Sequence, residues 1–251
     1  MIKPNKEIAE ICGIHAGDGY LRNDGKRVEL DLSGSLEEKI YYDNHVIPLF
    51  SNEFKVKIQP KWFKSRNTYG FVIRNIGIVT YIHELGFPYG KKSLYLKAPN
   101  FILKSKNPDL KIYFLRGLLD TDGCITFDRR YDKRYSNFKQ KYHTYPRLTL
   151  STISESLCLD IQKLLIQLKI NFWIQTYQPK NKNEKTKYIT WIRGKNFEKW
   201  MKIISSKNPT KYSRYKIWKI HGFCPANTTF KQRCNILTGE IKPRKMYEPV
   251  A

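Results

Sequence analysis

Two aspartates, Asp18 and Asp122, each follow a short apolar stretch, and each is followed by a glycine. They end the segments Ile11–Asp18 and Leu115–Asp122 and lie 104 residues apart in the sequence. A carboxylate repeated in matching surroundings indicates two half-sites built around one pair of acids. Oxygen ligands of this type suit Mg²⁺, and two or more such ions are able to activate a water and to stabilise the leaving oxygen of a phosphodiester.

The surroundings of these aspartates matter, because Asp-Gly alone usually marks a turn, as we expect for Asp24 and Gly25. Gly13 and Gly117 each stand five residues before the aspartate, inside a predicted helix. Glycine in a helix is less favourable than alanine by about 1 kcal/mol. Matching glycines predict that the two helices pack backbone to backbone. That contact would bring the two carboxylates together, where they repel unless divalent cations lie between them.

The chain of 251 residues carries a formal net charge of +24. Such a charge favours a polyanionic partner, first of all double-stranded DNA, because each Lys or Arg contact with a phosphate releases counterions. No run approaches the roughly 20 apolar residues of a membrane-spanning helix. The N-terminus lacks the apolar core of a signal peptide. We therefore expect an intracellular protein that binds no membrane.

Cysteine and tryptophan indicate no further site. The five cysteines are scattered, and no two have the Cys-x-x-Cys spacing, so free buried thiols are expected rather than zinc ligands or disulfides. The five tryptophans are expected in the core, and none is assigned to a ligand.

The same order of elements is predicted in both halves of the chain. Apolar periodicity and alternation predict, in the first half, helices over 6–17, 35–51 and 75–85 and strands over 27–33, 53–61 and 68–74. In the second half they predict helices over 109–121, 154–168 and 195–204 and strands over 123–128, 145–152, 170–177 and 187–193. This order indicates an α+β fold made of tandem αββαββα repeats with internal pseudo-two-fold symmetry.

Four segments are expected along the chain. Residues 1–90 form the N-terminal half and residues 109–221 form the C-terminal half. Residues 91–108 form a linker that packs over the surface. Residues 222–251 have no clear periodicity and form a C-terminal extension.

The paired motif resembles that of the LAGLIDADG homing endonucleases. Against the family's nine-letter pattern the second motif keeps Leu115, Gly117, Leu118, Asp120, Asp122 and Gly123. The first motif keeps Gly13, Asp18 and Gly19, has conservative changes at Ile11 and Ile14, and departs at His15 and Ala16. The order of the repeats and the separation of the motifs also fit the single-chain members, so the resemblance covers most of the chain.

The resemblance implies a saddle of two antiparallel sheets that straddles duplex DNA and cleaves both strands of a long recognition site across the minor groove. It implies that Asp18 and Asp122 bind the metal, helped by backbone carbonyls near Gly17 and Thr121. The expected ion is Mg²⁺, and Mn²⁺ or Ca²⁺ would also occupy the site. Ala16 replaces an aspartate that lies off the metal position, so little loss of activity is expected from it.

The family often adds one lysine per half near the scissile phosphate. Lys92 and Lys211 stand at corresponding points after the two repeats. A lysine there would polarise the water network or offset the charge of the transition state.

The outward faces of the predicted strands form the expected DNA-reading surface, since a two-stranded ribbon fits the major groove. The predicted contacts are Arg27, Asp31, Lys55, Lys57, Gln59, Lys61, Arg74, Arg147, Gln175 and Arg193, with Arg129 and Arg130 at the start of a basic, tyrosine-rich loop over 129–143. This loop and a second one over 179–187 are expected to order on binding.

Three functions remain open for such a chain, which is expected to act as a monomer. The first is a site-specific DNA endonuclease, the second a maturase that helps intron RNA to fold, and the third a non-catalytic DNA-binding regulator. The presence of both Asp18 and Asp122 favours cleavage, because an RNA chaperone needs no metal-binding acids. An intein is disfavoured, because splicing residues are absent from the two ends of the sequence.

Overall fold

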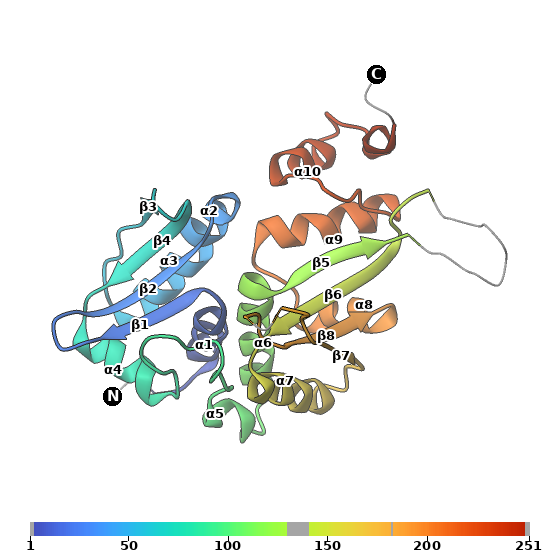
Figure 1. Ribbon diagram of the computed structural model, residues 1–251. Coiled ribbons are helices and arrows are strands. Elements are labelled where there is room, and N and C mark those ends of the chain that lie inside the picture. The colour runs from blue at the N-terminus through green and yellow to red at the C-terminus, as the bar shows by residue number, and fades with distance from the viewer. Residues whose placement is uncertain (1–2, 130–140, 182, 249–251) are drawn as a thin grey trace.

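Two four-stranded antiparallel sheets organise the computed structural model, which describes residues 3–129, 141–181 and 183–248 (Figure 1). The strand order is β1-β2-β4-β3 in the first sheet and β5-β6-β8-β7 in the second. The strands are β1 (Gly19–Asn23), β2 (Val28–Ser35), β3 (Lys61–Phe63), β4 (Thr68–Ile73), β5 (Cys124–Asp128), β6 (Tyr145–Thr152), β7 (Trp173–Tyr177) and β8 (Lys187–Arg193). The equal order confirms the predicted α+β fold of two repeats.

Helices α1 (Lys6–Asp18) and α6 (Pro108–Asp122) lie side by side between the two sheets, as Figure 1 shows. The first half also contains η1 (Leu36–Glu38), α2 (Lys39–Tyr41), the π-helical η2 (Tyr42–Val46), α3 (Ile47–Phe54) and α4 (Ile76–Glu84). The second half contains α7 (Glu155–Gln167), α8 (Lys195–Ile203) and α9 (Pro209–His221). The short α5 (Asn100–Leu103) lies in the linker, and α10 (Phe230–Leu237) and η4 (Pro243–Tyr247) follow α9.

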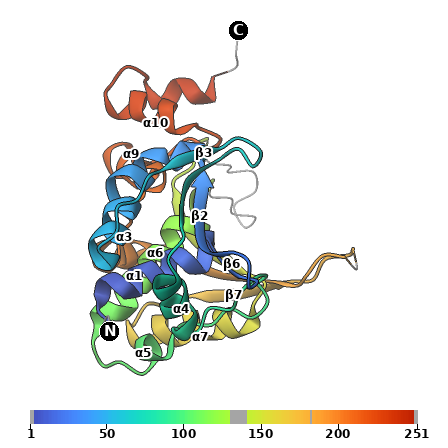
Figure 2. The ribbon, with the colours of Figure 1, turned by 90° about the vertical axis from the view of Figure 1, so that its left-hand side faces the viewer.

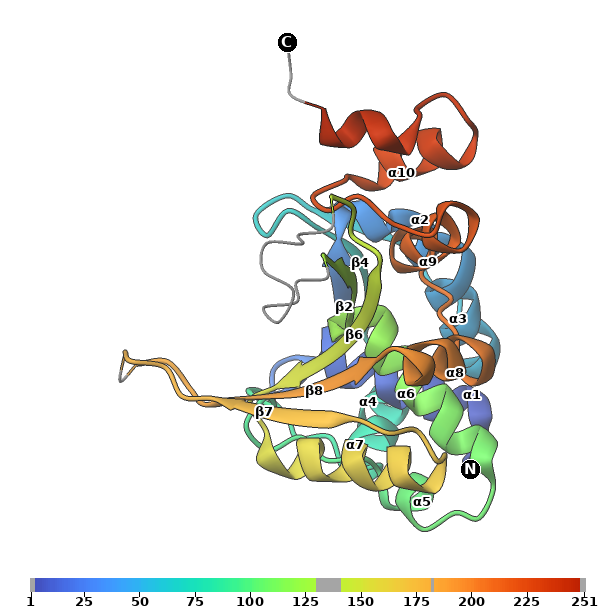
Figure 3. The same cartoon turned by 90° about the vertical axis from the view of Figure 1, so that its right-hand side faces the viewer.

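The helices gather on one side of the sheets, and the other side faces outward. Figures 2 and 3 show this division, with the end of the β7–β8 hairpin projecting away from the helices. The alternation of buried and outward-facing side chains along each strand explains this division. In β2, for example, Leu30 and Leu32 are fully buried, whereas Glu29 and Asp31 between and beside them are only partly covered. No helix of the described residues is long and apolar enough to cross a membrane.

The contact between α1 and α6, which we call the glycine seam, leaves no room for side chains at its centre. A Cβ atom at Gly13 would lie 2.1 Å from the carbonyl oxygen of Phe114, and one at Gly117 would lie 2.4 Å from that of Glu10. These distances are far below any normal contact with a backbone atom. The predicted backbone-to-backbone packing of the two helices is therefore confirmed.

A buried ion pair joins the same two helices. Arg116 on α6 donates from Nε to Oε1 of Glu10 at 2.9 Å and from Nη2 to Oε2 at 2.7 Å. His45 lies 2.8 Å from the same Oε1 atom. Burial raises the pKa of Glu10, but the bonds from His45 and Arg116 outweigh it and leave that pKa below its usual value. The ionised pair fixes the register of the two helices, because either charge alone would be buried without a partner.

The strand predicted over 53–61 is wrong for most of its length. Helix α3 continues to Phe54, and Lys55 ends it with a left-handed backbone (φ 54°). Strand β3 begins only at Lys61, directly after Pro60, which has no N–H to give to a ladder. Val56 and Ile58 still pack against the core, so the alternation arises from contact with the core and not from pairing in a sheet.

The last part of the second half was not fully predicted. Helix α9 follows Asn208, whose side chain accepts from the N–H of Thr210, and Pro209 occupies its first position. In the C-terminal extension, α10 begins with a capping box formed by Thr229 and Gln232. Buried Arg233 donates to Ser213 of α9 at 2.9 Å, so α10 packs on α9.

We predict that Gly13→Ala or Gly117→Ala lowers the free energy of unfolding by at least about 2 kcal/mol, because the new methyl group must push the two helices apart. Gly77→Ala is the control. It lies inside α4, where a Cβ would approach only the side-chain oxygen of Asn75, at 3.3 Å. That variant should be neutral or more stable by up to about 1 kcal/mol. Urea denaturation measures all three, and equal stabilities would contradict the close packing of the seam.

Candidate active site

The glycine seam brings the ends of the two motif helices together. Asp18 is the last residue of α1 and Asp122 is the last residue of α6. A Cβ atom at Gly17 would lie 3.3 Å from the carboxyl carbon of Asp122 and 2.1 Å from Oγ1 of Thr121. The two carboxylates therefore stand beside each other where the two helices meet the two sheets.

Asp18 is the more enclosed of the two acids. The Tyr42 hydroxyl donates to its Oδ2 atom at 2.7 Å. Glu38 is close as well, because Oδ2 of Asp18 and Oε2 of Glu38 each lie 2.9 Å from the Cβ position of Gly34. Burial raises the pKa of Asp18 to about 7. The charges of Glu38 and Asp122 act in the same direction, and the bond from Tyr42 acts against them.

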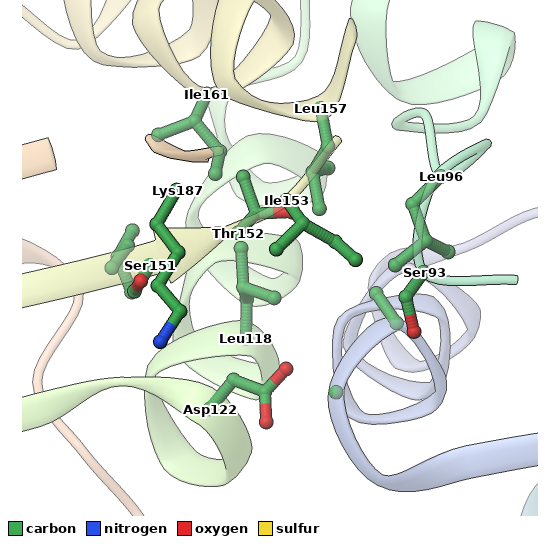
Figure 4. A pocket seen from close by; sticks show the side chains of 13 residues that line it. Ser93, Leu96, Leu118, Asp122, Ser151, Thr152, Ile153, Leu157, Ile161 and Lys187 are labelled. Carbon is green, nitrogen blue, oxygen red and sulfur yellow. The ribbon is translucent and has the colours of Figure 1, made fainter. Parts of the chain in front are cut away.

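Asp122 reaches the surface through a pocket of about 260 Å³. In Figure 4 its carboxylate lies below Leu118, and the amine of Lys187 at the start of β8 points toward the same space. Ser93 of the linker lines the opposite wall. The surrounding protein still removes enough solvent to raise the pKa of Asp122, although the positive charges of Lys92 and Lys211 oppose that rise.

Lys92 and Lys211 lie at equivalent places, each at the carboxyl end of one motif helix. Lys92 is buried, and its Nζ atom donates to the carbonyls of His15, Ala16 and Gly17 at 2.7, 2.8 and 2.9 Å. Lys211 at the start of α9 donates to the carbonyls of Leu119, at 2.8 Å, and Thr121. Burial lowers the pKa of Lys92 to about 8, although the charges of Asp122 and Asp18 favour its charged form. Each lysine thus adds a donor to carbonyl groups in the last turn of its helix, where intrahelical partners run out.

The donor atoms fit a divalent cation of the Mg²⁺ type. Two carboxylates with raised pKa values stand together, and every candidate ligand is an oxygen atom. Within the described ranges no group of three or more His, Cys, Asp and Glu side chains is placed to hold a metal. Asp18 and Asp122 would therefore depend on backbone, water or phosphate oxygens for the other positions. The carbonyls of Gly17 and Thr121, predicted to assist, already accept bonds from the two lysines.

The other acid of the second motif has a different environment. Asp120 is fully buried and accepts hydrogen bonds from the hydroxyl of Ser206 and, at 2.8 Å, the backbone N–H of Lys207. It thereby ties α6 to the turn that precedes α9. At the equivalent place of the first motif, Ala16 lies buried at the end of α1. Asp120 therefore stabilises the fold through its hydrogen bonds, and Ala16 contributes to packing.

Several polar residues around the two aspartates are not predicted by any sequence pattern. Tyr42 and Glu38 reach Asp18 from helical segments that follow β2, and Asn208 donates to Glu38 at 2.7 Å and to the carbonyl of Asp120 at 2.8 Å. Lys187 is predicted only as the junction between the loop over 179–187 and the strand over 187–193, with no role beside the aspartates. No local pattern marks any of these residues, because each is brought to the site by the packing of a separate element.

The residues predicted to contact DNA fall into three groups. Asp31, Lys61, Arg147, Gln175 and Arg193 lie in strands, and Arg27, Arg74 and Arg129 lie directly beside strands. Lys55, Lys57 and Gln59 are exposed but precede β3, so the predicted row of side chains along one strand is wrong for them. Arg130 and most of the predicted loop over 129–143 lie outside the described residues.

Several of these residues already have partners in the protein. Asp31 accepts from Arg66 at 2.9 Å, and Arg74 pairs with Glu29 at 3.3 Å.

The expectation that tryptophans are core residues fails in part. Trp200 is fully buried, but Trp62 and Trp173 expose 52% and 57% of their surface.

Known proteins resemble the chain in sequence and in fold. The family model of the LAGLIDADG-like domain matches residues 109–205. The ATP-dependent DNA helicase Hel308 of Thermococcus kodakarensis is 24% identical in an alignment of 224 residues that covers 86% of this chain. The chain spans only 18% of the length of that helicase.

Solved structures of homing endonucleases have a similar fold. Mesophilic variants of the homing endonuclease I-DmoI have a TM-score of 0.54 at 19% identity, over 80% of this chain and 95% of theirs. I-DmoI in complex with DNA and Mn has a TM-score of 0.54 at 18% identity, over 80% and 96%. The LAGLIDADG meganuclease I-AabMI bound to uncleaved DNA has a TM-score of 0.54 at 13% identity, over 99% of both chains. Residues 109–205 thus match the LAGLIDADG-like domain, and the chain as a whole has the fold of the homing endonucleases I-DmoI and I-AabMI.

Proposed function

We propose that the chain is a site-specific endonuclease that binds double-stranded DNA across its two sheets and hydrolyses a phosphodiester in each strand with divalent metal ions. The convergence of Asp18 and Asp122, at the ends of paired helices between two sheets of equal strand order, is the observation that carries this proposal. The net charge of +24 supports a nucleic-acid partner. I-DmoI has been crystallised with its DNA and Mn, Ca or Mg, which supports a divalent ion.

The side chains around the seam have separate roles in this proposal. Asp18 and Asp122 hold the ions, with Mg²⁺ as the working ion. Bound there, the ions would supply an activated water and stabilise the leaving oxygen. Tyr42 fixes the orientation of Asp18 through its hydrogen bond. Lys92 and Lys211 hold the last turns of α1 and α6 and place positive charge beside the acids, where it favours a bound phosphate.

The alternatives lack a comparable observation. An RNA maturase or a non-catalytic regulator would use the same basic surface, but neither needs two carboxylates crowded at one point. We propose further that the chain acts as a monomer, because both carboxylates come from one polypeptide. A role in homing is part of the same proposal.

We predict that Asp18→Asn or Asp122→Asn abolishes double-strand cleavage and leaves the affinity for DNA within about tenfold, since the fold and the basic surface are kept. The matched control is Asp24→Asn in the exposed β1–β2 turn, which should cleave like the parent protein. Gel assays of target DNA with Mg²⁺ measure cleavage, and binding is measured with Ca²⁺. Full activity in either site variant would refute the assignment of these acids.

The salt dependence of binding provides a second test. Because Lys and Arg contacts with phosphates release counterions, log K should fall by roughly 0.9 for each phosphate contacted per unit of log salt concentration. Fluorescence anisotropy over a range of KCl concentrations measures this slope. A slope near zero is incompatible with a basic DNA-binding saddle.

Lys92→Met should lower both stability and cleavage. Its loss removes a donor from three backbone carbonyls near the seam. The carbonyl of His15 keeps the N–H of Gly19, whereas those of Ala16 and Gly17 lose the donor that Lys92 supplies, at about 1–3 kcal/mol for each buried group left unsatisfied. Lys91→Met removes the same charge from the neighbouring exposed residue and is the control. Thermal melting and cleavage rates are compared for both. If the two variants behave alike, Lys92 has no special part in the site.

A further inference from the structure

The outward face of the second sheet carries two arginines packed against two tryptophans. We call Arg147, Arg193, Trp173 and Trp191 the guanidinium–indole cluster. Arg147 on β6 is paired with Arg193 on β8, and Trp191 is paired with Trp173 on β7. The guanidinium carbons of Arg147 and Arg193 lie 4.6 and 4.7 Å from the centre of the Trp191 ring, and that of Arg193 lies 5.6 Å from the Trp173 ring.

The alternation of the strands places this cluster away from the core. Leu148 and Ile192, which are paired with each other beside it, are fully buried on the helix side. Trp173 exposes 57% of its surface on the other side. An indole that stays so exposed contributes little to the stability of the free protein. Exposed aromatic groups of this kind often belong to a binding surface.

Trp191 is poorly placed to stack on a base or to donate to one. Two guanidinium groups lie over its ring, and its Nε1 atom is buried without a hydrogen-bond partner among the described residues. Its contacts instead restrict the two arginines. A guanidinium that packs on an aromatic face loses little further freedom when it binds.

The two arginines differ in how many of their hydrogen-bond donors are already in use. Arg147 donates to Thr126 at 3.0 Å and to Asp128 at 2.9 Å, so two of its donor atoms are in use. Arg193 is exposed and has no carboxylate partner among the described residues. Its guanidinium therefore presents a free edge that is already oriented by the two indoles. Such an edge matches the O6 and N7 acceptors of guanine in the major groove.

We propose that Arg193 reads a guanine in the major groove of the DNA half-site on the second sheet, and that Trp191 and Trp173 are positioning residues for its guanidinium. This inference rests on the proposed binding of duplex DNA. It adds which residue selects a base and which base is selected.

The first sheet has a different arrangement at the equivalent positions. Counting from the two aspartates through the ladders places Arg74 at the position of Arg193, Val72 at that of Trp191 and Glu29 at that of Arg147. Arg74 pairs with Glu29 and lacks an indole to hold it. The preference for guanine should therefore be strong only in the half-site of the second sheet, which makes the target asymmetric.

The test is selection of bound DNA from a randomised duplex library in Ca²⁺, followed by sequencing. The full chain should select guanine at one position of one half-site. Arg193→Gln should reduce that preference by about tenfold or more and shift it toward adenine, since glutamine matches the N6 and N7 atoms of adenine. Lys195→Gln, on α8 behind the sheet, removes the same charge and should keep the guanine. Arg74→Gln should produce a smaller change, in the other half-site.

Variants of the tryptophan test the positioning role. Trp191→Leu should weaken the guanine preference without shifting it to another base, and Trp191→Phe should restore most of it. Affinity for a non-specific duplex should stay within about twofold in both, because no phosphate contact is removed. Thermal melting confirms that both variants fold.

The possible outcomes separate the two proposals. If Arg193→Gln keeps the parent preference at every position, the guanine assignment is wrong although duplex binding stands. If the parent chain binds no duplex at all, the proposed function itself fails.

Discussion

The close approach of α1 and α6 is the constraint on which the rest of the structure depends. Because Gly13 and Gly117 have no side chains, the two backbones meet, and the last residues of both helices come to one point. Each sheet begins directly after that point, at Gly19 and Cys124. One contact therefore fixes the distance between the acids and also the placement of the two sheets relative to each other.

The symmetry of the backbone does not extend to the surroundings of the two acids. Asp18 is held by Tyr42 and lies near Glu38, whereas Asp122 opens into a pocket that Lys187 enters. Both carboxylates also stand at the carboxyl ends of helices, where the helix dipole disfavours negative charge. Lys92 and Lys211 offset this effect in both halves. The unfavourable effect of the helix dipole on each carboxylate is thus offset in both halves, although the other residues around the two carboxylates partly differ.

Patterns within single elements were enough to predict most of the fold and the central pair of acids. The strand over 145–152 and the ends of both motif helices follow directly from alternation, periodicity and Asp-Gly. The predictions that failed concern residues whose positions depend on contacts between distant segments. Val56 and Ile58 alternate like a strand because they touch the core, and Tyr42 and Asn208 reach the site only through tertiary packing. The exposure of Trp173 likewise could not be read from composition, since an indole in a sheet is able to face either side.

The alternation of the strands separates the residues that hold the fold from those that face outward. Leu30, Leu148 and Ile192 fill the core from the same strands whose other side carries Glu29, Arg147 and Arg193. Substitutions on the outer face therefore leave the core and the glycine seam untouched. If this face binds DNA as proposed, its recognition sequence can change by single substitutions that are each compatible with folding. Under the proposed function, the glycine seam would limit which reaction is performed, while the outer sheet face would set where on DNA it takes place.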